Sequence, residues 1–245
     1  MVPVDATVAR EHRWSPHLRG HLLQFGRPPV PAYRPHAGVR LVLAAVLVEA
    51  VRLSIPRWLA PGVPLWLLLP LVLGLGLVTV LGVTGVPLSQ LGLRRWRDWT
   101  MTEKSYFVQV VVLASVVFPL VLATPLRTRV AEFGMAWILW NVFVPYLFFG
   151  FYQELVYRGM LQRELVRRWS APIGIVVANV LYAFGPLHWN YFASSGSLAG
   201  PMFVSIFVIG LFFGVLYHRS GNLWIVAICH AIGNAFIVSS FGAIR

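Results

Sequence analysis

Long runs of apolar residues recur along most of this 245-residue chain. A helix of about 20 apolar residues crosses the hydrocarbon core of a bilayer. The sequence therefore predicts an all-α fold, a polytopic transmembrane bundle of about seven to eight helices. The expected spans lie at 39–59, 65–86, 106–122, 135–160, 173–192, 201–217 and 223–241.

The composition agrees with a membrane protein and excludes an ordinary soluble domain. Hydrophobic residues make up 58% of the chain and charged residues 11%, whereas about a quarter of a soluble domain is charged. The net charge of +12 comes mostly from arginines near the ends of apolar runs and in the N-terminal segment. That placement fits the positive-inside rule and an anionic leaflet. No basic stripe with interleaved aromatic residues is visible, so we expect a lipid bilayer and no nucleic acid as partner.

The domain organisation is predicted to be simple. Residues 1–38 read as a basic N-terminal tail that is cytoplasmic or interfacial, and residues 39–245 as one transmembrane domain. The tail lacks a short apolar core with a small-residue cleavage site, so we do not expect a cleaved signal peptide. Loops rich in basic residues alternate with loops that contain fewer of them. By the positive-inside rule this alternation places the N-terminus in the cytoplasm. The segment "PLSQLGLRRWRDW" (87–99) has the pattern of an interfacial helix.

A few polar side chains fall inside the expected spans. An ionisable group there costs a few kcal/mol on insertion scales, so each is a functional candidate. Glu154 and Arg158 are four residues apart and share one helix face, and Gln153 directly precedes them. His230 and Asn234 have the same four-residue spacing in the last span.

His188 belongs to the fifth expected span. If the fourth and fifth spans form a hairpin that turns near Ala171, Glu154 and His188 each lie 17 residues from the turn. At about 1.5 Å per residue they would have similar depth in the membrane and could face each other. We therefore expect one polar site built from three helices.

The residue types in this site favour amide hydrolysis. A carboxylate facing an imidazole can polarise a water molecule as a general base. A second histidine with an asparagine supplies hydrogen-bond donors where an oxyanion develops. Together these groups predict a hydrolase that uses no covalent intermediate.

The same residues resemble the CPBP family of intramembrane proteases. This family includes the type II CAAX prenyl endopeptidases and bacterial relatives once described as abortive-infection or bacteriocin-immunity proteins. Its pattern is Glu-Glu-x-x-x-Arg, then Phe-x-x-x-His, then His-x-x-x-Asn. The matching stretches here are "QELVYR" (153–158), "FGPLH" (184–188) and "HAIGN" (230–234), and the resemblance covers about residues 88–241.

The resemblance implies a role for each residue. His188 would activate the water together with the first glutamate of the pair. His230 and Asn234 would form the oxyanion site. Arg158 would orient Glu154. The implied activity is that of a glutamate-type intramembrane endopeptidase without a cofactor, which cleaves a membrane-embedded or lipid-anchored polypeptide near its C-terminus.

Gln153 departs from the family pattern, because it stands where the first glutamate is expected. A glutamine nearly matches glutamate in shape but cannot accept a proton as a carboxylate does. Three accounts compete. We favour a deliberately inactivated variant, since every other motif position is kept; the others are a natural lineage in which Glu154 is the base, and a pseudoenzyme.

A metal site is the main chemical alternative. His188, His230 and Glu154 could form a two-histidine, one-carboxylate site. There is no H-E-x-x-H spacing, and Asn234 suits an oxyanion role better than a metal ligand. We therefore expect a mechanism that needs no metal.

The remaining expectations concern the cellular location, the substrate and the alternative functions of the protein. The excess of arginine over lysine suggests a bacterial protein, located in the inner membrane as a multi-pass chain. Its substrate would be a C-terminal sorting helix or another membrane peptide, with the myxosortase-type branch as one candidate, and its oligomeric state is left open.

The runner-up function is that of a non-catalytic immunity or scaffolding protein. A transporter ranks third, because no repeated pair of broken helices appears. Glu49 and Arg52 read as a structural pair or as cavity lining.

Overall fold

The computed structural model describes residues 37–58, 63–185, 188–194 and 196–241. The described residues form helices and connecting turns, with no strand among them. The predicted all-α bundle is confirmed. The N-terminal tail lies almost entirely outside the described residues.

Helices follow one another along the chain with short connections. The α-helices are α1 (Ala37–Trp58), α2 (Leu65–Thr79), α3 (Met101–Val121), α4 (Ala123–Phe133), α5 (Met135–Ile138), α6 (Val144–Glu154), α7 (Arg163–Arg168), α8 (Ala171–Phe184), α9 (Trp189–Ser194), α10 (Ala199–Ser220) and α11 (Leu223–Phe241). Wider π-helical segments occupy Val80–Thr84, Leu139–Phe143 and Leu155–Gln162, and short 3-10 turns occupy Leu88–Leu91, Trp96–Asp98 and Gly196–Leu198.

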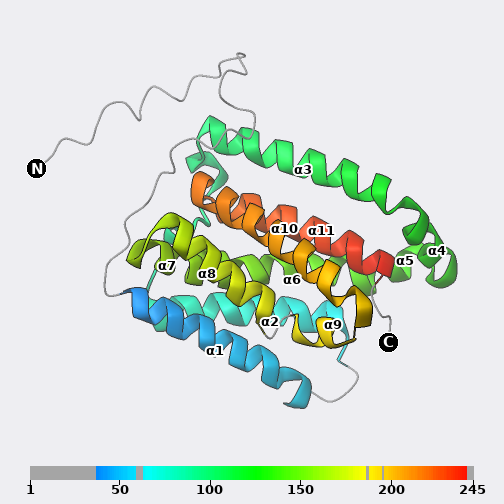
Figure 1. The fold of residues 1–245 in the computed structure, drawn as a ribbon, viewed down its shortest axis with the longest axis horizontal. Coiled ribbons are helices and arrows are strands. Elements are labelled where there is room, and N and C mark those ends of the chain that lie inside the picture. The colour runs from blue at the N-terminus through cyan, green and yellow to red at the C-terminus, as the bar shows by residue number, and fades with distance from the viewer. Residues whose placement is uncertain (1–36, 59–62, 186–187, 195, 242–245) are drawn as a thin grey trace, which may run out of the picture.

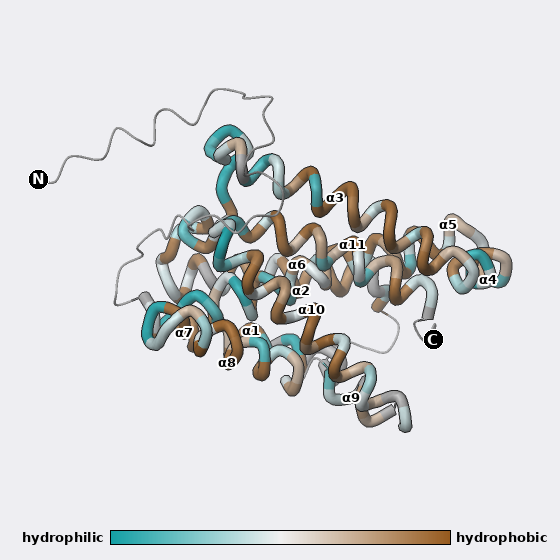
Figure 2. Tube along the Cα trace, turned by 45° about the horizontal axis from the view of Figure 1, so that its top comes forward, coloured by the Kyte–Doolittle hydropathy of each residue, from teal (hydrophilic) through white to brown (hydrophobic). Residues whose placement is uncertain are grey.

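Five of the described helices are long and apolar enough to cross a membrane, judged by length and composition. They are Trp66–Thr84, Glu103–Val121, Met135–Arg168, Ala199–Ser220 and Leu223–Ser240. Each corresponds to one expected span. In Figure 2 hydrophobic residues cover most of α3 and α10, while hydrophilic residues gather around α7 and before the start of α3. This pattern supports a multi-pass membrane protein.

Two expectations about the helices are wrong in detail. The fifth expected span, 173–192, is not one helix: α8 has 14 residues, about 21 Å of helix, and ends before α9 begins. The expected interfacial helix at 87–99 is instead a pair of 3-10 turns. Gly92 between them has φ 90°, a left-handed conformation that ends a helix, and its carbonyl accepts a hydrogen bond from the Leu223 amide at 3.0 Å. The segment therefore packs on the start of α11.

The central element of the bundle is one continuous helical stretch of 34 residues, Met135–Arg168. Two π-helical segments interrupt its α-helical geometry, and Pro145 lies two residues after the end of the first of them, at the second residue of α6. The second π-helical segment begins right after Glu154 and contains Arg158. Such segments are frequent at functional sites, because they change the face on which later side chains emerge.

The arrangement around this stretch positions the candidate residues. α6 packs against α11 on one side and α2 on the other, and α8 packs against α10 and α7. In Figure 1, α3 runs along one edge of the bundle and α1 along the opposite edge, with α6, α10 and α11 between them. The motif residues of α6 and α11 therefore meet in the interior of the bundle.

Gly150 allows the close contact between α6 and α11. A Cβ atom at Gly150 would lie 2.6 Å from the Cα atom of Ala231, the neighbour of His230. We therefore expect Gly150→Ala to lower the free energy of unfolding by about 1 to 3 kcal/mol, as over-packing does. Denaturation in detergent micelles measures this, with Gly74→Ala as control, because a Cβ at Gly74 meets nothing within 4 Å. Equal effects of the two substitutions would contradict the expected close contact.

Candidate active site

Glu154 is the charged centre of the site. It is the last residue of α6 and its side chain is fully buried. Its Oε1 atom lies 2.6 Å from Nδ1 of His230 on α11, and its Oε2 atom lies 3.5 Å from Nε of Arg158. A buried carboxylate needs such partners, because an uncompensated charge in the interior is very costly.

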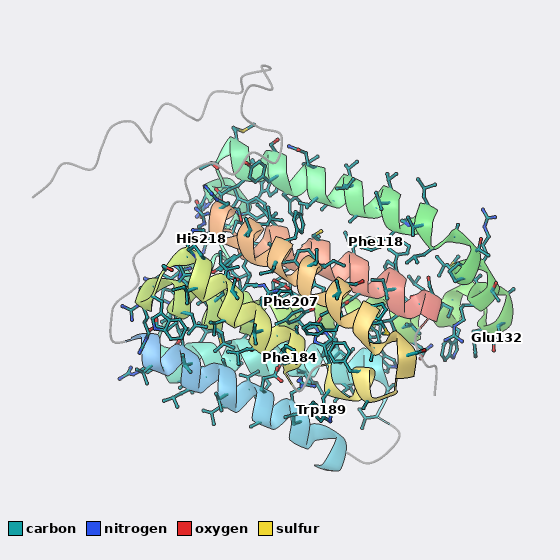
Figure 3. The ribbon with its side chains drawn as sticks, viewed as in Figure 1. Phe118, Glu132, Phe184, Trp189, Phe207 and His218 are labelled. Carbon is teal, nitrogen blue, oxygen red and sulfur yellow. The ribbon has the colours of Figure 1, made fainter. Side chains whose placement is uncertain are left out.

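Arg158 is held from the opposite side by α8 and α10. Its Nη2 atom donates to the Gly210 carbonyl at 2.9 Å and to Oδ1 of Asn179 at 3.4 Å. Asn179 in turn donates to the carbonyl of Phe207 at 2.8 Å, the residue that Figure 3 labels near the middle of α10. Gly210 is required here, because a Cβ atom would overlap Oδ1 of Asn179. The buried arginine is thus fixed by a polar network within an apolar bundle.

Gln153 and Asn234 form a second link between α6 and α11. Nδ2 of Asn234 donates to Oε1 of Gln153 at 2.7 Å, and Gln153 is 3% exposed. This contact runs beside the one between Glu154 and His230. Two consecutive residues of α6 therefore each bond to one member of the His-x-x-x-Asn pair.

His188 lies in the turn after α8, in the half-buried part of the site. Its Nδ1 atom is 2.9 Å from the carbonyl oxygen of Tyr182, and the two rings meet edge to face with centroids 4.7 Å apart. Figure 3 labels Phe184 and Trp189 on either side of this turn. Within the described part of the chain, Glu154 bonds to His230 rather than to His188. The structure therefore does not show the expected direct pairing of Glu154 with His188.

Tyr182 connects the parts of the site. Its hydroxyl lies 3.4 Å from Nε2 of His230, and the Arg158 guanidinium lies 4.8 Å from its ring centroid. The site is thus assembled from α6 with its π-helical extension, from α8 with the following turn, and from α11. All six expected site residues fall on these three elements.

The sequence reasoning overlooked two residues of this network, Asn179 and Tyr182. A buried amide in an apolar run is a signal, because it must find hydrogen-bond partners; Asn179 stands in such a run. Tyr182 gives a weaker signal, since tyrosine is common in apolar helices. The sequence feature that pointed to Tyr182 as part of the site is its position two residues before Phe184 of the motif.

Glu49 and Arg52 form the expected pair on α1, with Nη2 of Arg52 2.8 Å from Oε2 of Glu49. The other carboxylate oxygen of Glu49 accepts a hydrogen bond from the Tyr152 hydroxyl at 2.6 Å. Tyr152 directly precedes Gln153. The pair thus ties α1 to α6 beside the candidate residues, which supports its structural interpretation.

Part of the central ion pair has unused hydrogen-bonding capacity. Oε2 of Glu154 and Nε and Nη1 of Arg158 are buried and have no hydrogen-bond partner among the described residues. Buried polar atoms of this kind usually bind ordered water. The ion pair of Glu154 and Arg158 therefore offers the polar atoms that a bound water needs.

The positions of the possible metal ligands are relevant to the alternative that the site binds a metal ion. No group of three or more histidine, cysteine, aspartate or glutamate residues within the described ranges is placed to hold a metal ion. The Nδ1 atoms of His188 and His230 face different partners, Tyr182 and Glu154. Metal independence stays a prediction, to be tested by chelation.

The described helices thus form an all-α membrane bundle with a buried contact between Glu154 and His230. Residues 135–236 match the family model described as Type II CAAX prenyl endopeptidase Rce1-like. The matched range includes the candidate residues from Gln153 to Asn234. The match supports membership of the chain in the CPBP family, at the level of a CAAX-type intramembrane endopeptidase. No curated protein and no solved structure matches the chain.

Proposed function

We propose that this protein is an intramembrane endopeptidase of glutamate type, which hydrolyses a peptide bond near the C-terminus of a membrane-embedded or lipid-anchored polypeptide. The observation that carries the proposal is the pair of contacts between α6 and α11. Glu154 lies 2.6 Å from His230, and Gln153 lies 2.7 Å from Asn234. These contacts support the proposal, because they bring positions 153 and 154 next to His230 and Asn234, the residues proposed as oxyanion donors.

The proposed reaction divides the roles among these groups. A water molecule would be activated at position 153 together with His188, and would attack the scissile carbonyl. His230 and Asn234 would donate hydrogen bonds to the developing oxyanion. Glu154 already contacts His230 and Arg158, so its part is to position them.

Position 153 then decides the activity of the chain as written. The side-chain oxygen of Gln153 accepts from Asn234 but cannot take a proton from water. We infer that the chain as written cleaves slowly and that a glutamate at this position restores the base. The competing account, in which Glu154 itself is the base, would use its Oε2 atom, which lies 3.5 Å from Nε of Arg158 and has no hydrogen-bond partner among the described residues.

The setting that we propose is the bacterial inner membrane, with the substrate supplied as a C-terminal membrane segment. A library of such segments, reconstituted with the protein in proteoliposomes, tests the proposal through cleavage followed by mass spectrometry. Gln153 itself favours a second candidate, a non-catalytic immunity or scaffolding protein. Segments that bind the Gln153→Glu variant and stay intact would support this second candidate.

We expect proteolysis to survive exhaustive chelation. The proposed steps use only side chains of the protein and water, so removal of divalent metals leaves the reacting groups in place. The measurement is the cleavage rate of the Gln153→Glu variant before and after dialysis against a chelator, with the zinc content of the purified protein measured alongside. Stoichiometric zinc, together with activity that returns only when zinc is added, would overturn the metal-free mechanism.

A further inference from the structure

The ion pair of Glu49 and Arg52 on α1 is more accessible than the pair of Glu154 and Arg158. The side chain of Arg52 is 16% exposed and that of Glu49 13% exposed, whereas both side chains of the other pair are fully buried. The proposed mechanism uses Glu154 and Arg158 and gives no role to Arg52. A charged group in an apolar bundle that remains accessible is a candidate for contact with a ligand.

The hydrogen bonds of this pair leave one edge of the Arg52 guanidinium open. Nε and Nη2 of Arg52 both donate to the same oxygen of Glu49, Oε2, at 3.1 and 2.8 Å. The other oxygen, Oε1, accepts from the Tyr152 hydroxyl at 2.6 Å. Nη1 of Arg52 has no hydrogen-bond partner within the described part of the chain. An arginine has five donors in a fixed fork, so Nη1 and the second N–H of Nη2 can bind another carboxylate while Glu49 stays in place.

The pair lies close to the turn that carries His188. α1 packs against the π-helical segment that contains Tyr157. A Cβ atom at Gly185 would lie 3.1 Å from the Tyr157 hydroxyl, and the amide of His188 donates to the Gly185 carbonyl at 3.2 Å. The charge of Arg52 acts on both the Tyr157 hydroxyl and the His188 ring. The open edge of Arg52 is therefore near the histidine that is proposed to activate the water.

We propose that Arg52 binds the C-terminal carboxylate of the substrate, so that the site selects polypeptides with a free C-terminus. This inference rests on the proposed function, because cleavage near a C-terminus leaves that carboxylate a few residues beyond the scissile bond. A carboxylate that leaves water needs a cationic partner, and the donor geometry of arginine matches it. Glu49 holds Arg52 in position and, through its own negative charge, weakens the binding of the carboxylate.

Equilibrium binding to the chain as written, reconstituted in proteoliposomes, measures this selection without cleavage. The probe is a synthetic peptide of about 20 leucine and alanine residues, prepared once with a free C-terminal carboxylate and once as the C-terminal amide. We expect the free acid to bind about 10- to 100-fold more tightly than the amide, the effect of one hydrogen bond to a charged group. In Arg52→Met the ratio of the two affinities should fall to about one. Both peptides partition into the same lipid in every sample, so a change of this ratio between variants reports on the protein.

Two further variants separate binding by Arg52 from a structural effect of the pair. Arg129→Met is the matched control, because Arg129 pairs with Glu132 at the same three-residue spacing on α4; it should leave the ratio unchanged. Glu49→Gln keeps the arginine and removes the competing charge, so it should raise the ratio. A pair with a structural role alone would respond alike to Arg52→Met and Glu49→Gln. A ratio that Arg52→Met leaves unchanged, or that Glu49→Gln fails to raise, would overturn the inference.

Cleavage in the Gln153→Glu background distinguishes a failure of this inference from a failure of the proposed function. For a cleaved membrane segment prepared in the same two forms, Arg52→Met should raise KM of the free acid about tenfold or more and leave its kcat unchanged. If the Gln153→Glu variant cleaves nothing while the binding ratio depends on Arg52, the proposed function fails and the carboxylate site stands. If the acid and the amide are cleaved with equal KM, the proposed function stands and the carboxylate site is overturned.

Discussion

Replacing Gln153 with glutamate is expected to raise the rate of proteolysis by about 10²- to 10⁴-fold, the range of a positioned general base. The geometry favours this gain. A carboxylate oxygen can accept from Nδ2 of Asn234 as the amide oxygen of Gln153 does at 2.7 Å, so the link between α6 and α11 is kept. The second oxygen then supplies the proton acceptor that an amide lacks.

The rate is measured with membrane segments in proteoliposomes and compared with that of a control. Gln109→Glu adds a carboxylate to α3, where Gln109 bonds to Ser105, outside the candidate residues. We expect no gain from this control. An unchanged rate in folded Gln153→Glu would count against the assigned base position. If Glu154→Gln instead abolishes cleavage already present in the chain as written, Glu154 is the base.

Arg158→Met is expected to lower the free energy of unfolding by about 3 to 5 kcal/mol, the usual cost of breaking a buried ion pair from one side. Arg158 and Glu154 both have fully buried side chains. Without the arginine, the Glu154 carboxylate keeps only His230 as a partner. The carbonyl of Gly210 and the amide of Asn179 lose a donor as well.

Two further variants distinguish the loss of stability caused by breaking the buried ion pair from a general effect of removing an arginine. Arg97→Met breaks a contact with Asp98 in which both side chains are largely exposed, so it should cost no more than about 1 kcal/mol. Glu154→Gln combined with Arg158→Met removes both charges and should recover much of the lost stability. Reversible denaturation in detergent micelles measures all of these. A double variant as unstable as Arg158→Met alone would contradict the ion-pair explanation.

Much of the bundle could be predicted from the sequence, because apolar length is a strong signal. The long helices α3, α10 and α11 coincide with expected spans to within a few residues. The four-residue spacing of Glu154 and Arg158 also predicted their contact, since such residues share a helix face. Spacing within one helix is a local property, so it does not depend on how the helices pack.

Contacts between helices could not be predicted in the same way. Counting residues from a turn estimates depth in the membrane but not the direction in which a side chain points. The structure pairs Glu154 with His230, while His188 follows the end of α8 and bonds to Tyr182. The π-helical segment after Glu154 also changes the direction in which the side chains after it point, and no residue type in the sequence predicts such a segment.

The proposed mechanism requires that these residues form one site in which water attacks a peptide bond. The most direct measurement is intact-mass spectrometry of the Gln153→Glu variant and its products after cleavage in water enriched in oxygen-18. We expect product peptides whose new C-terminal carboxyl group carries the label, and a protein whose mass stays unchanged during turnover. A peptide covalently attached to the protein, or the absence of any labelled product, would contradict it.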